Sequence, residues 1–252
     1  MKTKKILLSS VCVTAMGAAL CGGFSQAASA ADMPLKAPPP PPVFSWTGCY
    51  VGANAGWGHA TRTWNGIATT PTTTPASVGT RGDGFVGGGQ LGCDYQTGNW
   101  VFGVEGMVDG STINYNTSLS SFLPGAFLTD KITAFETVTA RIGWAWDRSL
   151  FYVKGGGAWA QGSGAINAPL PFSSESHPIN SAGWLVGGGF EYAFTPNWSG
   201  KIEYDFMGFM NTTANFPLTT LPPGTVTFTH QTLQTLLLGL NYRFGAPFGA
   251  RY

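Results

Sequence analysis

The sequence contains little charge. Only 10% of its 252 residues are Asp, Glu, Lys or Arg, whereas roughly 25% is usual for soluble globular proteins. Glycine is frequent, with 36 residues, about double the average share of roughly 7%, but it follows no G-X-Y period. The composition therefore disfavours an ordinary soluble enzyme, excludes collagen, and favours strands that pack closely at glycine positions.

Long apolar runs are also missing beyond the first thirty residues. No later stretch reaches the roughly 18 uncharged apolar residues of a membrane-spanning helix. Residues 1–30 have a lysine-rich start, an apolar run and the small residues Ala-Ser-Ala at 28–30, which indicate a secretory signal peptide. Lipid attachment at Cys21 is the alternative, disfavoured by Leu20 before it. A membrane location would therefore require strands.

The mature chain carries no strong charge of either sign. Removing the three lysines of the signal lowers Lys+Arg from 13 to 10 against 12 Asp+Glu, a net charge of −2. No basic patch indicates nucleic acid as a partner. Five consecutive prolines, Pro38–Pro42, favour an extended segment, so residues 31–45 are interpreted as a proline-rich periplasmic spacer.

From Trp46 onward, apolar and small or polar residues alternate with period two in eight segments. In the last one, Leu236, Leu238, Leu240, Tyr242 and Phe244 share one face. The segments are joined alternately by tight turns near residues 96–99, 146–149 and 195–197 and by long polar links at 61–81, 110–130, 162–181 and 211–231. Short turns at one end and long loops at the other are typical of outer-membrane barrels. The sequence thus predicts an all-β fold, an eight-stranded antiparallel up-and-down transmembrane barrel at residues 46–244, with a C-terminal extension at 245–252.

Aromatic and charged residues fit this plan. Seven aromatic residues flank the tight turns, where an interfacial girdle is expected: Trp46, Tyr95, Trp100, Trp144, Trp146, Phe194 and Trp198. Eight charges share the face opposite the apolar one and are predicted to form a charge network in the lumen: Glu105, Arg141, Lys154, Glu191, Lys201, Glu203, Asp205 and Arg243. Glu136 has lipid-face parity but lies toward the long-loop end, above the hydrocarbon.

Five motifs resemble the porin-like small outer-membrane barrels of alphaproteobacteria, which are related to the OmpA-type transmembrane domain. They are W-T-G-C-Y-V-G-A-N-A-G at 46–56, N-W-V-F-G-V-E-G at 99–106, T-A-R-I-G-W-A at 139–145, F-Y-V-K-G-G-G-A at 151–158 and L-G-L-N-Y-R-F at 238–244. The resemblance implies a bacterial outer-membrane location and insertion by the outer-membrane assembly machinery. Gly239, Tyr242 and Phe244 match the assembly signal of such barrels, while Leu237 and the extension after Phe244 depart from it.

An eight-stranded barrel is just wide enough for side chains to fill it, so the lumen charges are expected to pair with one another; a water-filled channel is the alternative. Cys49 and Cys93 share a face on adjacent strands, and a disulfide is expected in an oxidising compartment, with free thiols as the alternative. Three scattered histidines, His59, His177 and His230, lack metal-ligand spacing. The sequence therefore predicts no catalytic residue, metal or cofactor.

Three functional classes remain. A structural barrel that contributes to envelope integrity, in contact with outer-membrane lipid, is the favoured one, and it would not be an enzyme. A narrow porin for small solutes is one alternative. A surface protein that binds a ligand or haem through the four long loops, or acts there as an adhesin or enzyme, is the other.

Overall fold

The computed structural model describes residues 44–67, 76–118, 125, 127–167, 175–216 and 224–244. The expected signal peptide, nearly all of the spacer and the C-terminal extension lie outside the described residues. The strands are β1 (Gly48–Ile67), β2 (Ala76–Thr97), β3 (Trp100–Ser111), β4 (Asn114–Ser118), β5 (Phe127–Trp146), β6 (Ser149–Asn167), β7 (Glu175–Ala193), β8 (Trp198–Phe209), β9 (Thr212–Phe216) and β10 (Gly224–Phe244). Within these ranges, the chain forms no helix that could cross a membrane.

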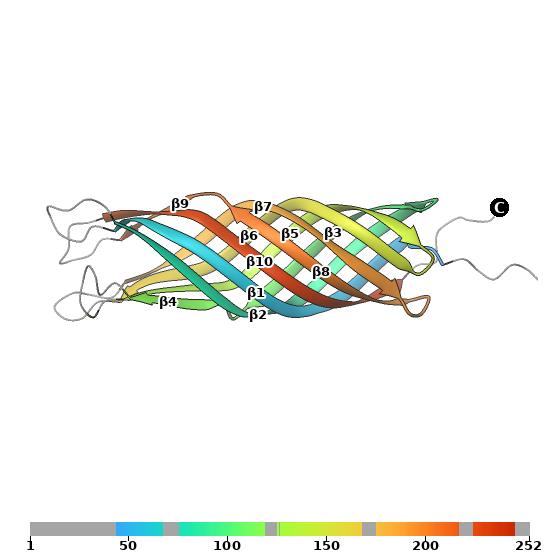
Figure 1. The fold of residues 1–252 in the computed structure, drawn as a ribbon, viewed down its shortest axis with the longest axis horizontal. Coiled ribbons are helices and arrows are strands. Elements are labelled where there is room, and N and C mark those ends of the chain that lie inside the picture. The colour runs from blue at the N-terminus through green and yellow to red at the C-terminus, as the bar shows by residue number, and fades with distance from the viewer. Residues whose placement is uncertain are drawn as a thin grey trace, which may run out of the picture. The chain divides into compact units, whose positions relative to one another are not determined.

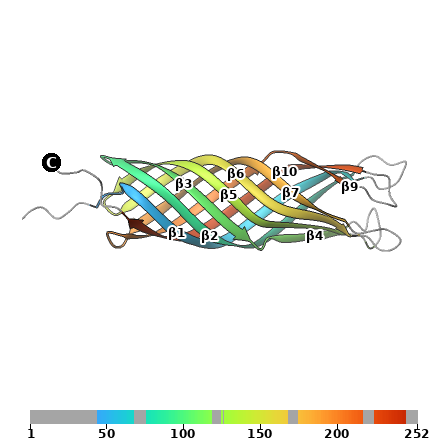
Figure 2. The same ribbon diagram turned by 180° about the vertical axis from the view of Figure 1, so that it is seen from behind.

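Eight strands close into a ring in which every neighbour is antiparallel. Their order is β1-β2-β3-β5-β6-β7-β8-β10, and β10 pairs back with β1. Figures 1 and 2 show the tilted strands of this barrel from opposite sides. The short strands β4 and β9 extend the wall at one end, β4 paired with β5 and β9 with β10. The predicted eight-stranded up-and-down barrel is confirmed.

The period-two alternation determines which side chains face out. On β10, Leu236 and Leu238 are 52% and 65% exposed on the outer wall, while Leu237 between them is fully buried inside. A one-residue shift in register would exchange the two faces. The pairings of β10 with β1, such as Ala55 with Leu238, therefore keep the apolar side chains outside.

Tight turns join the strands at one end. Gly98 turns β2 into β3 with φ of 59°, and Asp147 turns β5 into β6 with φ of 51°, a left-handed conformation that Gly and Asp tolerate better than other residues. The third turn runs from Phe194 to Asn197, between β7 and β8. All three coincide with the predicted turns.

The four links predicted to be long loops consist mostly of strand, so this prediction is wrong. The link at 61–81 consists largely of β1, which continues to Ile67, and β2, which begins at Ala76. The other three links hold strand in the same way: β4 and the start of β5 within 110–130, parts of β6 and β7 within 162–181, and β9 with the start of β10 within 211–231. His59, His177 and His230 consequently lie on strands rather than in loops.

The long strands exceed what a bilayer requires. About 9–11 tilted residues span the hydrocarbon, and β1 has 20 residues, β2 has 22 and β10 has 21. The outward face of β1 is apolar up to Trp57 and then continues with His59, Thr61 and Thr63. The barrel wall therefore has a lipid-facing section next to the tight turns and a polar section beyond it, called here the outer extension.

Candidate functional site

All eight predicted lumen charges point into the barrel. They come from six strands and are between 0% and 5% exposed: Glu105, Arg141, Lys154, Glu191, Lys201, Glu203, Asp205 and Arg243. Their positions on β3, β5, β6, β7, β8 and β10 share the inward parity of the alternation. Because charges this deeply buried must be paired to be tolerated, their mutual geometry decides what the lumen can do.

The part of the network nearest the tight turns is built on two arginines. Arg141 on β5 donates from Nε to Asp94 Oδ1 at 2.7 Å and approaches Glu191 Oε2 to 3.4 Å through Nη1. A second guanidinium nitrogen of Arg141 contacts the other oxygen of Asp94, a forked pair. Arg243 on β10 reaches Asp94 Oδ2 at 2.9 Å and Glu191 Oε1 at 3.4 Å. Two carboxylates and two guanidinium groups thus hold β2, β5, β7 and β10 together.

The adjoining part of the network is built on two lysines. Lys154 Nζ lies 2.7 Å from Glu203 Oε1 and 3.2 Å from Glu105 Oε1. Lys201 Nζ lies 3.1 Å from Glu105 Oε2 and 3.2 Å from Glu203 Oε2. Asp205 Oδ2 is 3.2 Å from Lys154 Nζ. Each lysine therefore bridges the same two glutamates across the lumen.

Two tyrosines complete the network. Tyr50 donates to Glu105 Oε2 at 2.7 Å, and Tyr152 donates to Glu203 Oε2 at 2.6 Å. The guanidinium carbon of Arg141 lies 4.9 Å and 5.1 Å from the centroids of these two rings, a cation–π distance. Tyr50 brings β1 into the network, so each of the eight ring strands supplies at least one member.

Sequence reasoning missed several of these partners. Asp94 has the same inward parity as the eight predicted charges, and this parity was the signal that could have identified it. Asp109 also has inward parity and is buried in the lumen. Together with the eight predicted charges, these two make six carboxylates against four cations. Tyr50 and Tyr152 also have inward parity, but nothing in the alternation shows that a hydroxyl will reach a carboxylate.

Trp46 was wrongly assigned to the interfacial girdle. It is fully buried, its ring lies 4.7 Å from the guanidinium carbon of Arg243, and its carbonyl oxygen accepts from Arg243 Nη1 at 2.8 Å. Phe44 packs edge-on against it at 5.0 Å. The chain therefore folds into the barrel mouth beside the turns from Phe44 onward. The other six girdle residues are exposed on the outer wall, as predicted.

Apolar side chains occupy the lumen on both sides of the charges. Near the turns, Trp46 packs with Val101, Leu150 and neighbours. Toward the outer extension lies a larger cluster, named here the apolar plug: Ala60, Val86, Met107, Ile113, Tyr115, Ile132, Phe135, Ala158, Ala160, Leu185, Met207, Leu233 and Leu237. Leu237, which departs from the family's terminal-strand pattern, is thereby explained as a member of this plug.

The outer extension has an interior of its own. Arg62 Nη1 contacts Asp130 Oδ1 at 2.5 Å, and the two side chains are 5% and 0% exposed. Trp64 and Ile179 are buried at the same end and both border Gly164. On the outer surface, His59 pairs with Asp83 at 2.6 Å, and Gln161 donates to Glu136, which is exposed as its parity predicted.

Cys49 and Cys93 form a disulfide between directly paired positions of β1 and β2, as expected. Gly239, Tyr242 and Phe244 lie on β10, where Tyr242 packs against Trp198 at 5.1 Å; their part in assembly stays a prediction. Within the described residues, no group of three His, Cys, Asp or Glu side chains is arranged to hold a metal ion. The geometry of the site is that of ionic cross-links.

The chain is similar to known outer-membrane proteins. Residues 16–244 match the outer membrane protein beta-barrel domain. The chain is 35% identical over 203 residues to the 31 kDa outer-membrane immunogenic protein of Brucella melitensis, covering 74% of this chain and 83% of that protein. It is 28% identical to the 25 kDa outer-membrane immunogenic protein of Brucella canis, over 88% of this chain and 92% of that protein.

Among solved structures, the attachment invasion locus protein Ail of Yersinia pestis aligns with a TM-score of 0.39 at 15% identity, over 79% of this chain and 99% of that chain. The family match and the Brucella relatives, together with the closed barrel, show that this chain belongs to the outer membrane protein β-barrel family and resides in the bacterial outer membrane.

Proposed function

We propose that the protein is a structural, non-conducting barrel that contributes to the integrity of the outer membrane. The observation that carries the proposal is the burial of the eight lumen charges, all 5% exposed or less, in ion pairs that link the ring strands. A pore needs water in contact with its lining charges, and these charges contact one another instead. We also infer that the protein is not an enzyme.

The ion pairs support a structural role because they connect strands far apart in the ring. Arg141 on β5 and Arg243 on β10 meet at the same two carboxylates, Asp94 on β2 and Glu191 on β7. Such pairs are costly to break once buried, since the remaining partner is left as an uncompensated charge. The barrel is thereby expected to resist deformation as the membrane around it is stressed.

Deleting the gene tests the proposal. We expect the deletion strain to become more sensitive to detergent and to large antibiotics that an intact outer membrane excludes, and the wild-type gene to restore resistance. Two variant genes introduced into the deletion strain refine the test. The Asp83→Asn variant, which changes a residue on the outer surface, should restore resistance fully. The Arg141→Gln variant, which changes a residue of the charge network, should restore resistance less. Unchanged sensitivity on deletion would contradict the structural role.

A second candidate role is contact with molecules outside the cell, which the outer extension favours. Its outer wall carries polar side chains such as His59, Arg81 and Lys131 above the lipid-facing section, and the two Brucella relatives are named immunogenic proteins. Antibodies raised against the folded barrel should bind intact cells if the extension is displayed. Binding that appears only after the cells are permeabilised would exclude this role.

A further inference from the structure

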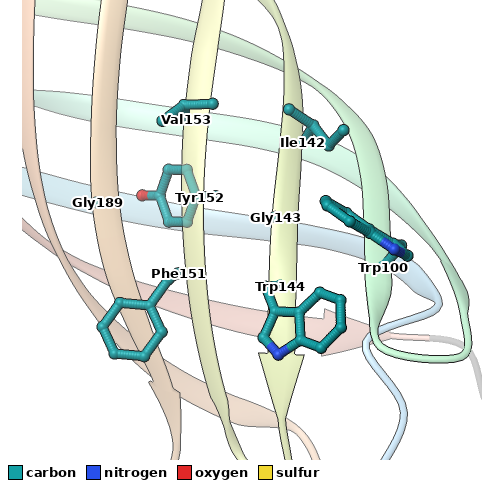
Figure 3. Close-up of a pocket in the computed structure, with 8 residues that line it drawn as sticks. All are labelled: Trp100, Ile142, Gly143, Trp144, Phe151, Tyr152, Val153 and Gly189. Atoms are coloured by element: carbon teal, nitrogen blue, oxygen red, sulfur yellow. The ribbon is translucent and has the colours of Figure 1, made fainter.

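The outer wall of the barrel has a groove near the tight turns, and neither the structural role nor contact with molecules outside the cell involves this groove. It has a volume of about 360 Å³ and crosses β5, β6 and β7 (Figure 3). Trp144 and Phe151 form its wall on the turn side, and Ile142 and Val153 form the opposite wall. Between these walls, Tyr152 pairs with Gly143 on one side and with Gly189 on the other. The Tyr152 side chain points into the lumen and the two glycines have none, so only backbone faces outward along this row.

Two local features shape the ends of this groove. Trp100 on β3 packs edge-on against Trp144, with ring centroids 5.0 Å apart and planes at 89°, so the wall there is two indoles thick. On the far side, Val153 pairs with Gly188 of β7, an outward position with no side chain. The groove therefore begins at a double tryptophan wall and opens across β7.

The groove opens onto hydrocarbon rather than water. Its wall residues belong to the lipid-facing section: Val153 is 60% and Phe151 54% exposed on the same face as Val51 and Leu91. It lies at the tight-turn end, which is periplasmic in outer-membrane barrels. The molecules that reach it are therefore the lipids of the periplasmic leaflet, and an acyl chain has the apolar, narrow shape that its lining fits.

A cation lies where the headgroup of such a lipid would be. Arg148 stands in the turn beyond Trp146 and Ser149, which pair two positions past Trp144 and Phe151, roughly 7 Å farther along the strands at about 3.3 Å per residue. It is exposed, and one guanidinium nitrogen lies 3.5 Å from the carbonyl oxygen of Phe194. Guanidinium groups bind phosphate through their fork of donors.

We propose that this groove is a specific site for one phospholipid of the periplasmic leaflet, with an acyl chain between Trp144 and Val153 and the phosphate at Arg148. The site differs from general lipid contact in predicting one molecule that exchanges slowly. It is independent of the lumen, since its contact surface faces the opposite side of the wall.

Native mass spectrometry tests the proposal. The folded full-length mature barrel, reconstituted in vesicles of palmitoyl-oleoyl-phosphatidylglycerol and extracted into mild detergent, should retain one phospholipid. Val153→Trp fills the groove and should abolish that adduct. Val104→Trp is the matched control, because Val104 is also a lipid-facing valine with 60% exposure but lies outside the groove, and it should retain the lipid. Arg148→Gln should lower the fraction of barrel carrying phosphatidylglycerol.

Heat-modifiable migration on gels verifies that each variant is folded before it is compared. A wild-type barrel without a retained lipid would overturn the proposal. So would equal retention, or equal loss, in Val153→Trp and Val104→Trp, because either result would place the lipid elsewhere. An adduct unaffected by Arg148→Gln would overturn the assignment of the phosphate to Arg148.

Discussion

At the scale of single residues, Arg141 shows how the lumen is held together. Its guanidinium group contacts Asp94 and Glu191 and lies 3.9 Å from Glu105, while its faces meet the rings of Tyr50 and Tyr152. Desolvating such a group is expensive, and only well-placed partners offset the cost. The network therefore adds little net stability, but it makes any arrangement in which one of these charges loses its partner strongly unfavourable.

Arg141→Gln should destabilise the barrel by about 3–5 kcal/mol, because Asp94 and Glu191 lose a buried partner. The matched control is Asp83→Asn, which removes the exposed pair with His59 and should cost no more than about 1 kcal/mol. Urea unfolding in lipid vesicles, followed by tryptophan fluorescence, measures both. Equal losses of unfolding free energy in the two variants would show that the lumen pairs contribute no more to stability than the exposed pair.

The disulfide is the second prediction at this scale. Cys49 and Cys93 are 44 residues apart in sequence, and closing a loop of this size removes entropy from the unfolded chain worth about 2–4 kcal/mol. Reductant should lower the urea midpoint of the wild-type barrel and leave that of the Cys49→Ser/Cys93→Ser variant unchanged. A wild-type midpoint that is the same with and without reductant would contradict this expectation.

At the scale of elements, six of the eight ring strands, β1, β2, β5, β6, β7 and β10, are about twice as long as a bilayer requires. The lipid-facing part of β1 ends at Trp57, and ten more residues follow, up to and including Ile67. At about 3.3 Å per residue and a tilt of about 40°, they extend roughly 25 Å beyond the hydrocarbon. The barrel therefore continues outside the membrane as a walled structure with its own buried pair, Arg62 and Asp130.

Cysteine labelling tests this arrangement on one strand. Arg81 and Leu91 both face outward on β2, ten positions apart, Arg81 in the outer extension and Leu91 in the lipid-facing section. In intact cells, a membrane-impermeant maleimide should modify Arg81→Cys and leave Leu91→Cys unmodified. Labelling of both positions, or of neither, would place the boundary of the bilayer elsewhere.

Period-two alternation was sufficient to predict the lipid-facing section. There, one face must suit hydrocarbon and the other a packed lumen, so apolar and small or polar residues alternate visibly. In the outer extension both faces can be polar: Thr61 and Thr63 face out, while Arg62 and Trp64 face in. Without lipid on one side the alternation of apolar and polar residues disappears, so the sequence pattern does not distinguish these strands from loops.

The candidate site was predictable to a similar degree. Parity alone placed the eight charges in the lumen, because a charge facing mid-bilayer lipid costs roughly 2–4 kcal/mol. Which carboxylate each cation contacts depends on strand tilt and stagger, which the sequence pattern does not contain. The position of Trp46 was not predicted for a related reason. It precedes β1, so the strand alternation does not determine which face its side chain takes. In the structure its ring lies against the guanidinium group of Arg243 inside the barrel.

At the scale of the whole molecule, the lumen is filled along the barrel. The cluster around Trp46, the charge network, the apolar plug and the buried pair of the outer extension follow one another from the turn end outward. Closure of the ring satisfies the backbone groups that a bilayer could not, and the buried side chains of these clusters pack its interior.

Single-channel recording in a planar bilayer tests the filled lumen most directly. The refolded mature barrel, shown to be inserted and heat-modifiable, should give no stable openings, and Glu105→Gln should be equally silent because the plug and the cluster around Trp46 remain. A porin inserted in the same bilayer serves as the positive control. Stable openings of the wild-type barrel whose conductance changes in Glu105→Gln would make the charge network a conduction path and contradict the account.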